Sequence, residues 1–307
     1  MVFTRRQWIT TGALTAGCFG LYFGLRAMPV EACEVLHYGD YVNAEGVIEG
    51  CGYEEVGFFD LEAMRFPLLA ELEPLGSVRA GEPATFLLHL HTFTGKAVSY
   101  RDLAVSHTER LHAMVVDTTL EDYQHVHPRD GGAPGTFILE FEPQRAGAYQ
   151  IYFDFIPLQT ARRSLVAATV EVAPAEAVDL EAAAGPARAM SGPDDLDVRL
   201  VTDADALRAG EEVTFRLEVA QSSGDAPLRF DPIMDSYAHL VAFAPGRTGF
   251  AHFHPRDPFI DGQDPLNPSL DFLFAADDPG EYRVWAQFSV NGREHFVPFD
   301  LTVAAAG

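Results

Sequence analysis

An internal repeat constrains the fold of this chain more than any other feature of its sequence. Three motifs occur twice and in the same order: Arg-Ala-Gly-Glu (79–82 and 208–211), His-x-His-Pro-Arg-Asp (125–130 and 252–257) and Gly-x-Tyr (147–149 and 280–282). Self-similarity of this kind is the signature of a duplicated structural unit. We therefore expect two copies of one domain of roughly 100 residues, a common domain size.

The repeat divides the chain into five segments. They are an N-terminal signal or transmembrane anchor (1–27), a lead-in with no counterpart in the second half (28–68), a first β-sandwich repeat (69–172), a linker (173–195) and a second β-sandwich repeat (196–307). The linker is rich in Ala, Pro, Gly and acidic residues, and its Gly-Pro pairs at 185–186 and 192–193 interrupt regular structure.

Each repeat has the residue pattern of β-strands. Residues 84–91 and 213–219 alternate between polar and apolar, and so do 149–155 and 282–288. Short runs of this kind, separated by Gly, Pro and Asp turns, predict an all-β sandwich with about seven strands in each repeat. The Gly-x-Tyr motif at the start of a strand is common in immunoglobulin-like domains. The predicted fold class is therefore all-β, with two tandem immunoglobulin-like sandwiches.

The first 27 residues predict a targeting or anchoring segment. Arg5 and Arg6 precede an uncharged, mostly apolar stretch over residues 8–25, and a helix of that length extends roughly 27 Å. We expect a single transmembrane helix in the inner (cytoplasmic) membrane, with the sandwiches facing the periplasm. Residues 4–9 also resemble a twin-arginine export signal. The alternative is therefore a periplasmic protein that is secreted after Tat-type export.

The charge of the chain excludes one class of partner. The sequence has 45 acidic and 21 basic residues, which gives a formal net charge of -24 at pH 7. Nucleic-acid binding depends on neutralising phosphates with basic side chains. We therefore expect no nucleic-acid partner.

The cysteines fit an exported protein. Cys33 and Cys51 flank a polar segment, and a disulfide between them is plausible in an oxidising compartment. The alternative is two unpaired thiols. The sequence has no Cys-x-x-Cys, which excludes thioredoxin-like chemistry and attachment of a c-type haem.

Six histidines follow one repeated spacing, H-x12-H-x-H. They are His112, His125 and His127 in the first repeat and His239, His252 and His254 in the second. Histidines at positions i and i+2 of a strand point to the same face, and a hairpin would bring the first histidine of each set beside them. Three converging imidazoles can bind Cu(II) or Zn(II), with a carboxylate or water as the fourth ligand. The alternative is a structural role, in which the imidazoles hydrogen-bond to nearby carbonyls and were duplicated with the domain.

Other residues near these motifs have weaker patterns. Asp130 and Asp257 follow the two His-x-His pairs, and Met114 shares a strand face with His112. His89 and His91 are also two residues apart on a predicted strand but have no counterpart in the second repeat, which favours a surface or sheet-face role. The isolated histidines have no assigned role: His37, His107 and His295.

The histidine motifs resemble those of a class of exported bacterial β-sandwich proteins. The signature of this class is a histidine followed by hydrophobic residues and, further along, Phe/Tyr-x-His-x-His-Pro. In this chain, residues 111–117 and 123–128 match its two parts, and residues 239–241 and 250–255 are similar. This class is FixH/YtkA-like or CopC-like in style and is associated with copper and other heavy metals. The resemblance implies cupredoxin/CopC-like sandwiches with a metal site over most of both repeats. The chain departs from CopC proteins, whose ligands lie close to the mature N-terminus.

The sequence lacks the motifs of common enzyme classes. Gly-x-Ser-x-Gly, a Gly-rich dinucleotide loop and His-Glu-x-x-His are absent, and the segment 95–97 lacks the Ser or Thr of a P-loop. We therefore expect a non-enzymatic, membrane-anchored periplasmic protein that binds Cu or Zn through the two histidine clusters. The alternative is a structural accessory subunit, with membrane proteins as partners, that braces a respiratory or photosynthetic complex through its helix and sandwiches.

Overall fold

The computed structural model describes most of the chain. The described residues are 4–26, 42–48, 58–60, 66–175, 196–223, 227–247, 249–256 and 260–307. The predicted Cys33–Cys51 disulfide lies outside them. The chain forms two units, residues 1–35 and 36–307, and the second contains both repeats.

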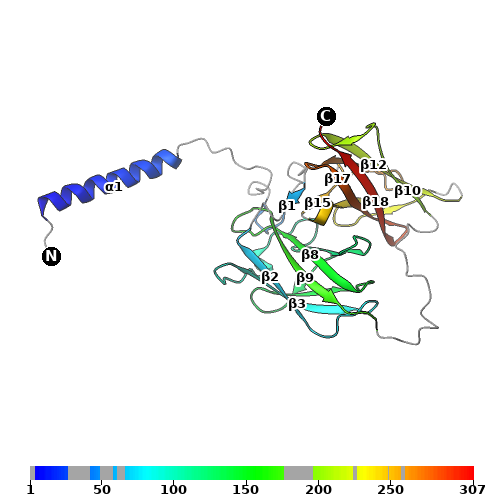
Figure 1. Ribbon diagram of the computed structural model, residues 1–307, viewed down its shortest axis with the longest axis horizontal. Helices are drawn as coiled ribbons and strands as arrows, with labels where there is room; N and C mark the ends of the chain where they lie inside the picture. The colour runs from blue at the N-terminus through cyan, green and yellow to red at the C-terminus, as the bar shows by residue number, and fades with distance from the viewer. Residues whose placement is uncertain are drawn as a thin grey trace. The chain divides into compact units, whose positions relative to one another are not determined.

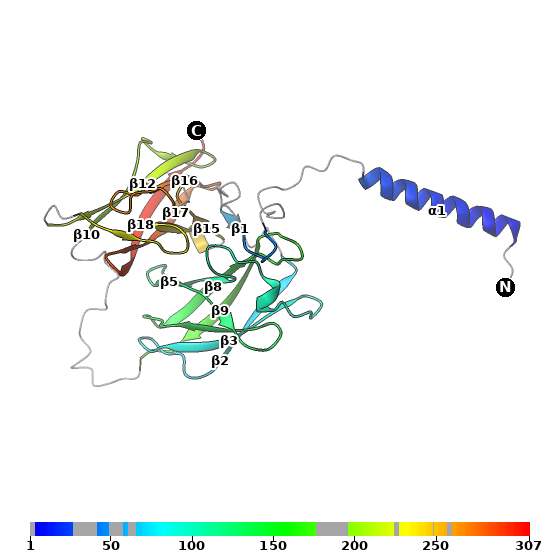
Figure 2. The same cartoon turned by 180° about the vertical axis from the view of Figure 1, so that it is seen from behind.

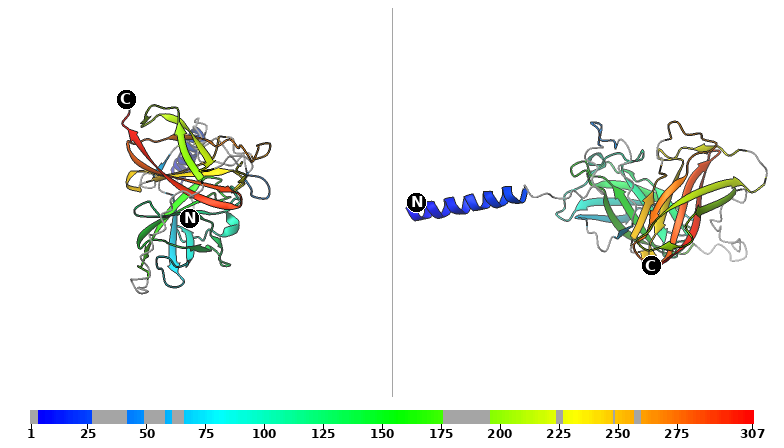
Figure 3. Two further views of the ribbon diagram at one scale, coloured as in Figure 1. Left: turned by 90° about the vertical axis from the view of Figure 1, so that its right-hand side faces the viewer. Right: turned by 90° about the horizontal axis from the view of Figure 1, so that it is seen from above.

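The first unit contains one uninterrupted helix, α1 (Arg5–Arg26) (Figure 3). No helix among the described residues is long and apolar enough to cross a membrane. This finding corrects the prediction of a transmembrane helix over residues 8–25. The physical reason is the composition of α1, in which glycines and threonines dilute the apolar side chains.

The first repeat is a sandwich of two antiparallel sheets (Figure 1). One sheet has, in spatial order, β2 (Leu68–Pro74), β3 (Ala84–Thr92), β7 (Thr136–Phe141) and β6 (Arg129–Asp130). The other has β5 (Tyr123–Val126), β4 (His112–Asp117), β8 (Gly147–Phe155) and β9 (Ser164–Val172). Figure 2 shows β2 and β3 side by side.

The second repeat has the same order of equivalent strands. Its smaller sheet is β10 (Leu196–Thr202), β12 (Glu212–Gln221) and β16 (Asp271–Ala275). Its larger sheet contains β15 (Gly249–Phe253), β14 (Ala238–Phe243), β17 (Gly280–Val290) and β18 (Arg293–Ala304), with the short strands β1 (Phe59–Asp60), β11 (Leu207–Arg208) and β13 (Phe230–Asp231) at its margins. Short helices at Tyr100–Asp102 and Pro245–Arg247 complete the regular structure of the described residues.

This topology confirms the immunoglobulin-like prediction. The sheet orders of the first repeat are those of strands A-B-E-D and C′-C-F-G of an immunoglobulin sandwich. The Gly-x-Tyr motif opens strand F in both repeats, and its tyrosine forms a corner that fixes the preceding loop. The Tyr149 hydroxyl lies 3.2 Å from the carbonyl oxygen of Arg145, and the Tyr282 hydroxyl donates to the carbonyl oxygen of Asp278 at 2.8 Å.

The lead-in contributes to both repeats rather than standing apart. Val47 forms a parallel bridge with Val105 of the first repeat. Strand β1 pairs antiparallel with β15, with Phe59 opposite Phe250, and so covers the edge of the larger sheet of the second repeat.

Three apolar clusters hold residues 36–307 together, one in each sandwich and one between the repeats. Along β4, Ala113 and Val115 point into the core of the first sandwich, whereas Met114 and Val116 point toward the second repeat. Strand β14 alternates in the same way, so both strands are buried on two faces. The cluster between the repeats, which we call the inter-repeat cluster, consists of Met114, Val116, Tyr123, Tyr152, Leu165, Val241, Phe243, Phe250 and Trp285.

Replacing Trp285 should test the inter-repeat cluster. Its side chain is 1% exposed, and its indole N–H donates to the carbonyl oxygen of Leu120 in the other repeat at 3.3 Å. We expect Trp285→Ala to lower the free energy of unfolding by about 3–5 kcal/mol, because a large buried ring is lost. Denaturant titration measures this change. Phe93→Ala is the matched control, since Phe93 is 61% exposed, and its effect should stay within about 0.5 kcal/mol. Equal effects of the two changes would contradict the packing described here.

Candidate metal centre

Two equivalent hairpins position the six predicted histidines. In the first repeat, β4 begins with His112 and pairs antiparallel with β5, which places Met114 opposite His125. In the second repeat, Val241 is opposite His252 in the hairpin of β14 and β15. The alternation of each strand directs these histidines to the face that carries the inter-repeat cluster.

The hairpins bring the histidines together in two triads, as the sequence predicted. The triads are His112, His125 and His127, and His239, His252 and His254, each with one ring nitrogen per residue within 4.8 Å of the others. The first two histidines of each triad are buried, and the third is partly buried. The described residues add no carboxylate to either triad. Asp130 is exposed on β6, in the other sheet of the sandwich, and Asp257 lies outside the described residues.

A backbone carbonyl fixes the tautomer of the first histidine in each triad. His112 Nε2 lies 3.0 Å from the carbonyl oxygen of Ser106, and His239 Nε2 lies 3.0 Å from that of Ile233. A carbonyl oxygen only accepts hydrogen bonds, so Nε2 carries the proton in both rings. The Nδ1 atoms of His112 and His239 therefore carry lone pairs. Such an outer hydrogen bond is the usual way in which proteins orient a metal-binding histidine.

A glutamine of the second repeat fixes the tautomer of His125. Gln287 donates through its amide nitrogen to Glu294 Oε1 at 2.6 Å, so its carbonyl oxygen Oε1 faces His125. His125 Nδ1 lies 2.9 Å from that oxygen and must be the donor. The lone pair of His125 is therefore on Nε2, the atom that faces the rest of the triad.

Two lone pairs consequently face each other inside the first triad. His112 Nδ1 and His125 Nε2 are 3.2 Å apart, and neither carries a proton when both rings are neutral. This contact is repulsive unless a cation lies between the two nitrogens. The remaining candidate ligand atoms are buried and have no hydrogen-bond partner among the described residues: His127 Nε2, His239 Nδ1, His252 Nε2 and His254 Nε2. Buried polar atoms are nearly always satisfied, so this donor set fits a bound metal ion.

Burial keeps these imidazoles neutral at pH 7. Desolvation is the main cause in each ring, and the neighbouring histidines add to it. It lowers the pKa of His112 and His127 to about 4 and that of His239 to about 3. The pKa values of His125, His252 and His254 are also well below the usual 6.5. Neutral imidazole is the form that binds metals.

The lowered pKa values predict a stability that falls in acid. Below pH 6.5 these histidines take up protons in the unfolded chain but not in the folded one, so protons favour unfolding. We expect the Tm of the metal-free protein to decrease as the pH falls from 6.5 toward 4. Thermal unfolding in the presence of a chelator measures it. The His127→Ala/His254→Ala variant should show a shallower decrease, and an unchanged slope would contradict burial as the cause.

The structure adds a seventh histidine that the sequence gave no role. His107 lies in the loop before β4 with a positive φ of 50°, and its ring stacks on His254 at a centroid distance of 3.9 Å. Burial is the main cause that lowers its pKa to about 3. His107 is not part of the H-x12-H-x-H spacing, so only the packing of the repeats shows that it lies beside the second triad. His89 and His91 lie on β3, outside the triads, and Met114 packs in the inter-repeat cluster.

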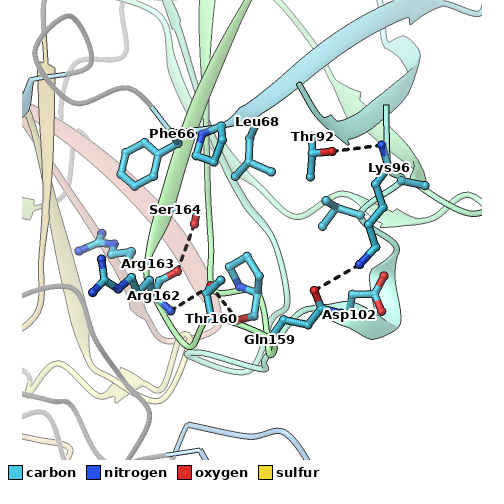
Figure 4. A pocket seen from close by; sticks show the side chains of 14 residues that line it. Phe66, Leu68, Thr92, Lys96, Asp102, Gln159, Thr160, Arg162, Arg163 and Ser164 are labelled. Carbon is cyan, nitrogen blue, oxygen red and sulfur yellow. Dashed lines mark hydrogen bonds between the residues drawn. The ribbon is translucent and has the colours of Figure 1, made fainter. Parts of the chain in front are cut away.

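A separate pocket of about 480 Å³ lies on the first repeat (Figure 4). Lys96, the only lysine of the chain, donates to Gln159 Oε1 across it at 3.3 Å. Arg163 also lines the pocket and makes a buried ion pair with Asp154 at 2.6 Å. Asp154 is opposite His112 in the pairing of β4 with β8. This ion pair therefore lies on the same sheet as His112 of the first triad.

Comparison with protein families identifies the repeated unit. The family described as Domain of unknown function (DUF8832) matches residues 70–174 and again 190–305. This chain belongs to that family. The double match confirms the tandem repeat, and each copy contains one histidine triad.

Other comparisons give only distant similarities. No curated protein matches the sequence. Among solved structures, the fibronectin(III)-like modules of Clostridium thermocellum CbhA share 10% identity, with 78% of this chain and 95% of that chain covered and a TM-score of 0.21. The Yersinia pseudotuberculosis adhesin InvE shares 11% identity, with 76% of this chain and 58% of that chain covered and a TM-score of 0.22. With TM-scores this low, the two structures indicate nothing about the fold or function of this protein.

Proposed function

We propose that this protein binds transition-metal ions, Cu or Zn, at its two histidine triads. The observation that carries the proposal is the pair of facing lone pairs on His112 and His125, whose tautomers are fixed by Ser106 and Gln287. A cation between the two nitrogens turns this repulsion into ligation. Imidazole is a good ligand for both metals, and three imidazoles leave a fourth position for water or another ligand.

Other features of the chain support a binding role. The described residues place only neutral imidazoles in the two triads. The net charge of -24 raises the local concentration of cations around the protein. Arg5 and Arg6 at the start of α1, followed by an uncharged stretch, support export from the cytoplasm. Handling of metal ions outside the cytoplasm is the function that these features support best.

Metal content tests the proposal directly. We expect the full chain, loaded with Zn(II) and dialysed, to retain about two equivalents, one for each triad. His127→Ala/His254→Ala removes one ligand from each triad and should lose most of this metal. His89→Ala/His91→Ala is the matched control, because it removes a His-x-His pair that lies outside the triads, and it should retain both ions. Elemental analysis of the three proteins, with Tm as a check of folding, gives the result. A folded chain without metal would refute the proposal.

The outer hydrogen bond to His125 gives a second test. Gln287→Met preserves side-chain volume but removes the acceptor that fixes the tautomer of His125, so we expect the affinity of the first triad to fall about 10–100-fold. Competition with a chromophoric chelator measures both affinities, and that of the second triad should change less. Gln150→Met, on the equivalent strand β8 of the first repeat, is the control. Equal affinities in all three proteins would show that Gln287 does not support the site.

A further inference from the structure

The histidine rings of the two triads contact one another across the boundary between the repeats. The ring centroids of His125 and His252 are 5.3 Å apart with nearly perpendicular planes, and those of His112 and His252 are 6.1 Å apart. Within the triads, His112 and His125 are 5.4 Å apart, and His252 and His254 are 4.7 Å apart. Spacings between the triads are therefore close to spacings within them, and the six rings form one cluster.

Each triad is also contacted by a side chain of the other repeat. His107 of the first repeat stacks on His254 and lies 6.4 Å from His239, so it forms one wall of the second triad. In return, Gln287 of the second repeat accepts the hydrogen bond that orients His125 in the first triad. Each triad therefore takes its three histidines from one repeat and a supporting side chain from the other.

We infer that the two triads form a single two-ion centre at the contact between the repeats. This inference rests on the metal binding proposed above. Each ion lies about 2 Å from its ligand nitrogens, which places the two ions within roughly 12 Å of each other across the rings of His125 and His252. The inter-repeat cluster holds the two faces together beside the centre.

The charge of the ligands predicts how the centre fills. All six ligands are neutral imidazoles, so nothing in the triads offsets the positive charge of two divalent ions. Charges separated by this distance in a buried site repel strongly, because little water screens them. The second divalent ion therefore binds at least about tenfold more weakly than the first.

Cu(II) titration of the full chain, followed by electron paramagnetic resonance, tests the inference. The protein carries His89→Ala and His91→Ala so that this partly exposed pair does not bind copper. At one equivalent we expect the spectrum of isolated Cu(II). At two equivalents we expect dipolar broadening, which arises only when two unpaired electrons lie close together. This comparison of the spectra at one and at two equivalents needs no substitution in the triads themselves.

Two matched variants complete the experiment. His127→Ala and His254→Ala change equivalent residues of the two triads, and each should bind one Cu(II) with an isolated spectrum. If the full chain binds two ions but its spectrum is the sum of the two variant spectra, the two-ion centre is wrong and metal binding stands. Dipolar broadening that persists in either variant also overturns the inference. If no copper binds, the proposed function fails as well.

Discussion

The apolar contact between the outer faces of two sheets is the constraint on which the rest of this structure depends. An immunoglobulin-like sandwich normally buries only the inner face of each sheet, and its outer face remains in water. In this chain the outer faces of β4 and β14 are also covered, by the inter-repeat cluster. The contact converts two separate domains into one body over residues 36–307.

The same contact creates the chemistry of the histidines. On an isolated repeat the triads would lie on an open sheet face, where water would satisfy each ring nitrogen. Covering both faces removes that water and lowers the imidazole pKa values, and it leaves four ring nitrogens without partners in the part of the chain that the structure describes. Burial of the apolar side chains favours packing of the repeats. The same contact removes water from the imidazoles and leaves their nitrogens available to a cation.

The sequence predicts the fold and the members of each triad, because both depend on local patterns. Alternation along strands, the Gly-x-Tyr corners and the H-x12-H-x-H spacing each involve one repeat, and each appears in the structure. The roles of His107 and Gln287 arise between the repeats, and no pattern within one repeat could reveal them. The transmembrane prediction for residues 8–25 is not supported, because the glycines and threonines of α1 lower the hydropathy of a stretch that is otherwise long and uncharged.

The unpartnered nitrogens favour the proposed metal binding over the purely structural alternative. A structural His-x-His turn should use its ring nitrogens in hydrogen bonds to neighbouring carbonyls. The described residues show bonds to carbonyl oxygens for His112, His239 and His125, in each case on the nitrogen that points away from the triad. Each unsatisfied buried nitrogen costs roughly 1–3 kcal/mol, and four of them amount to a large part of a typical stability of about 5–15 kcal/mol. A structural role alone would lower stability in both repeats, whereas a bound cation offsets this cost at every one of these nitrogens.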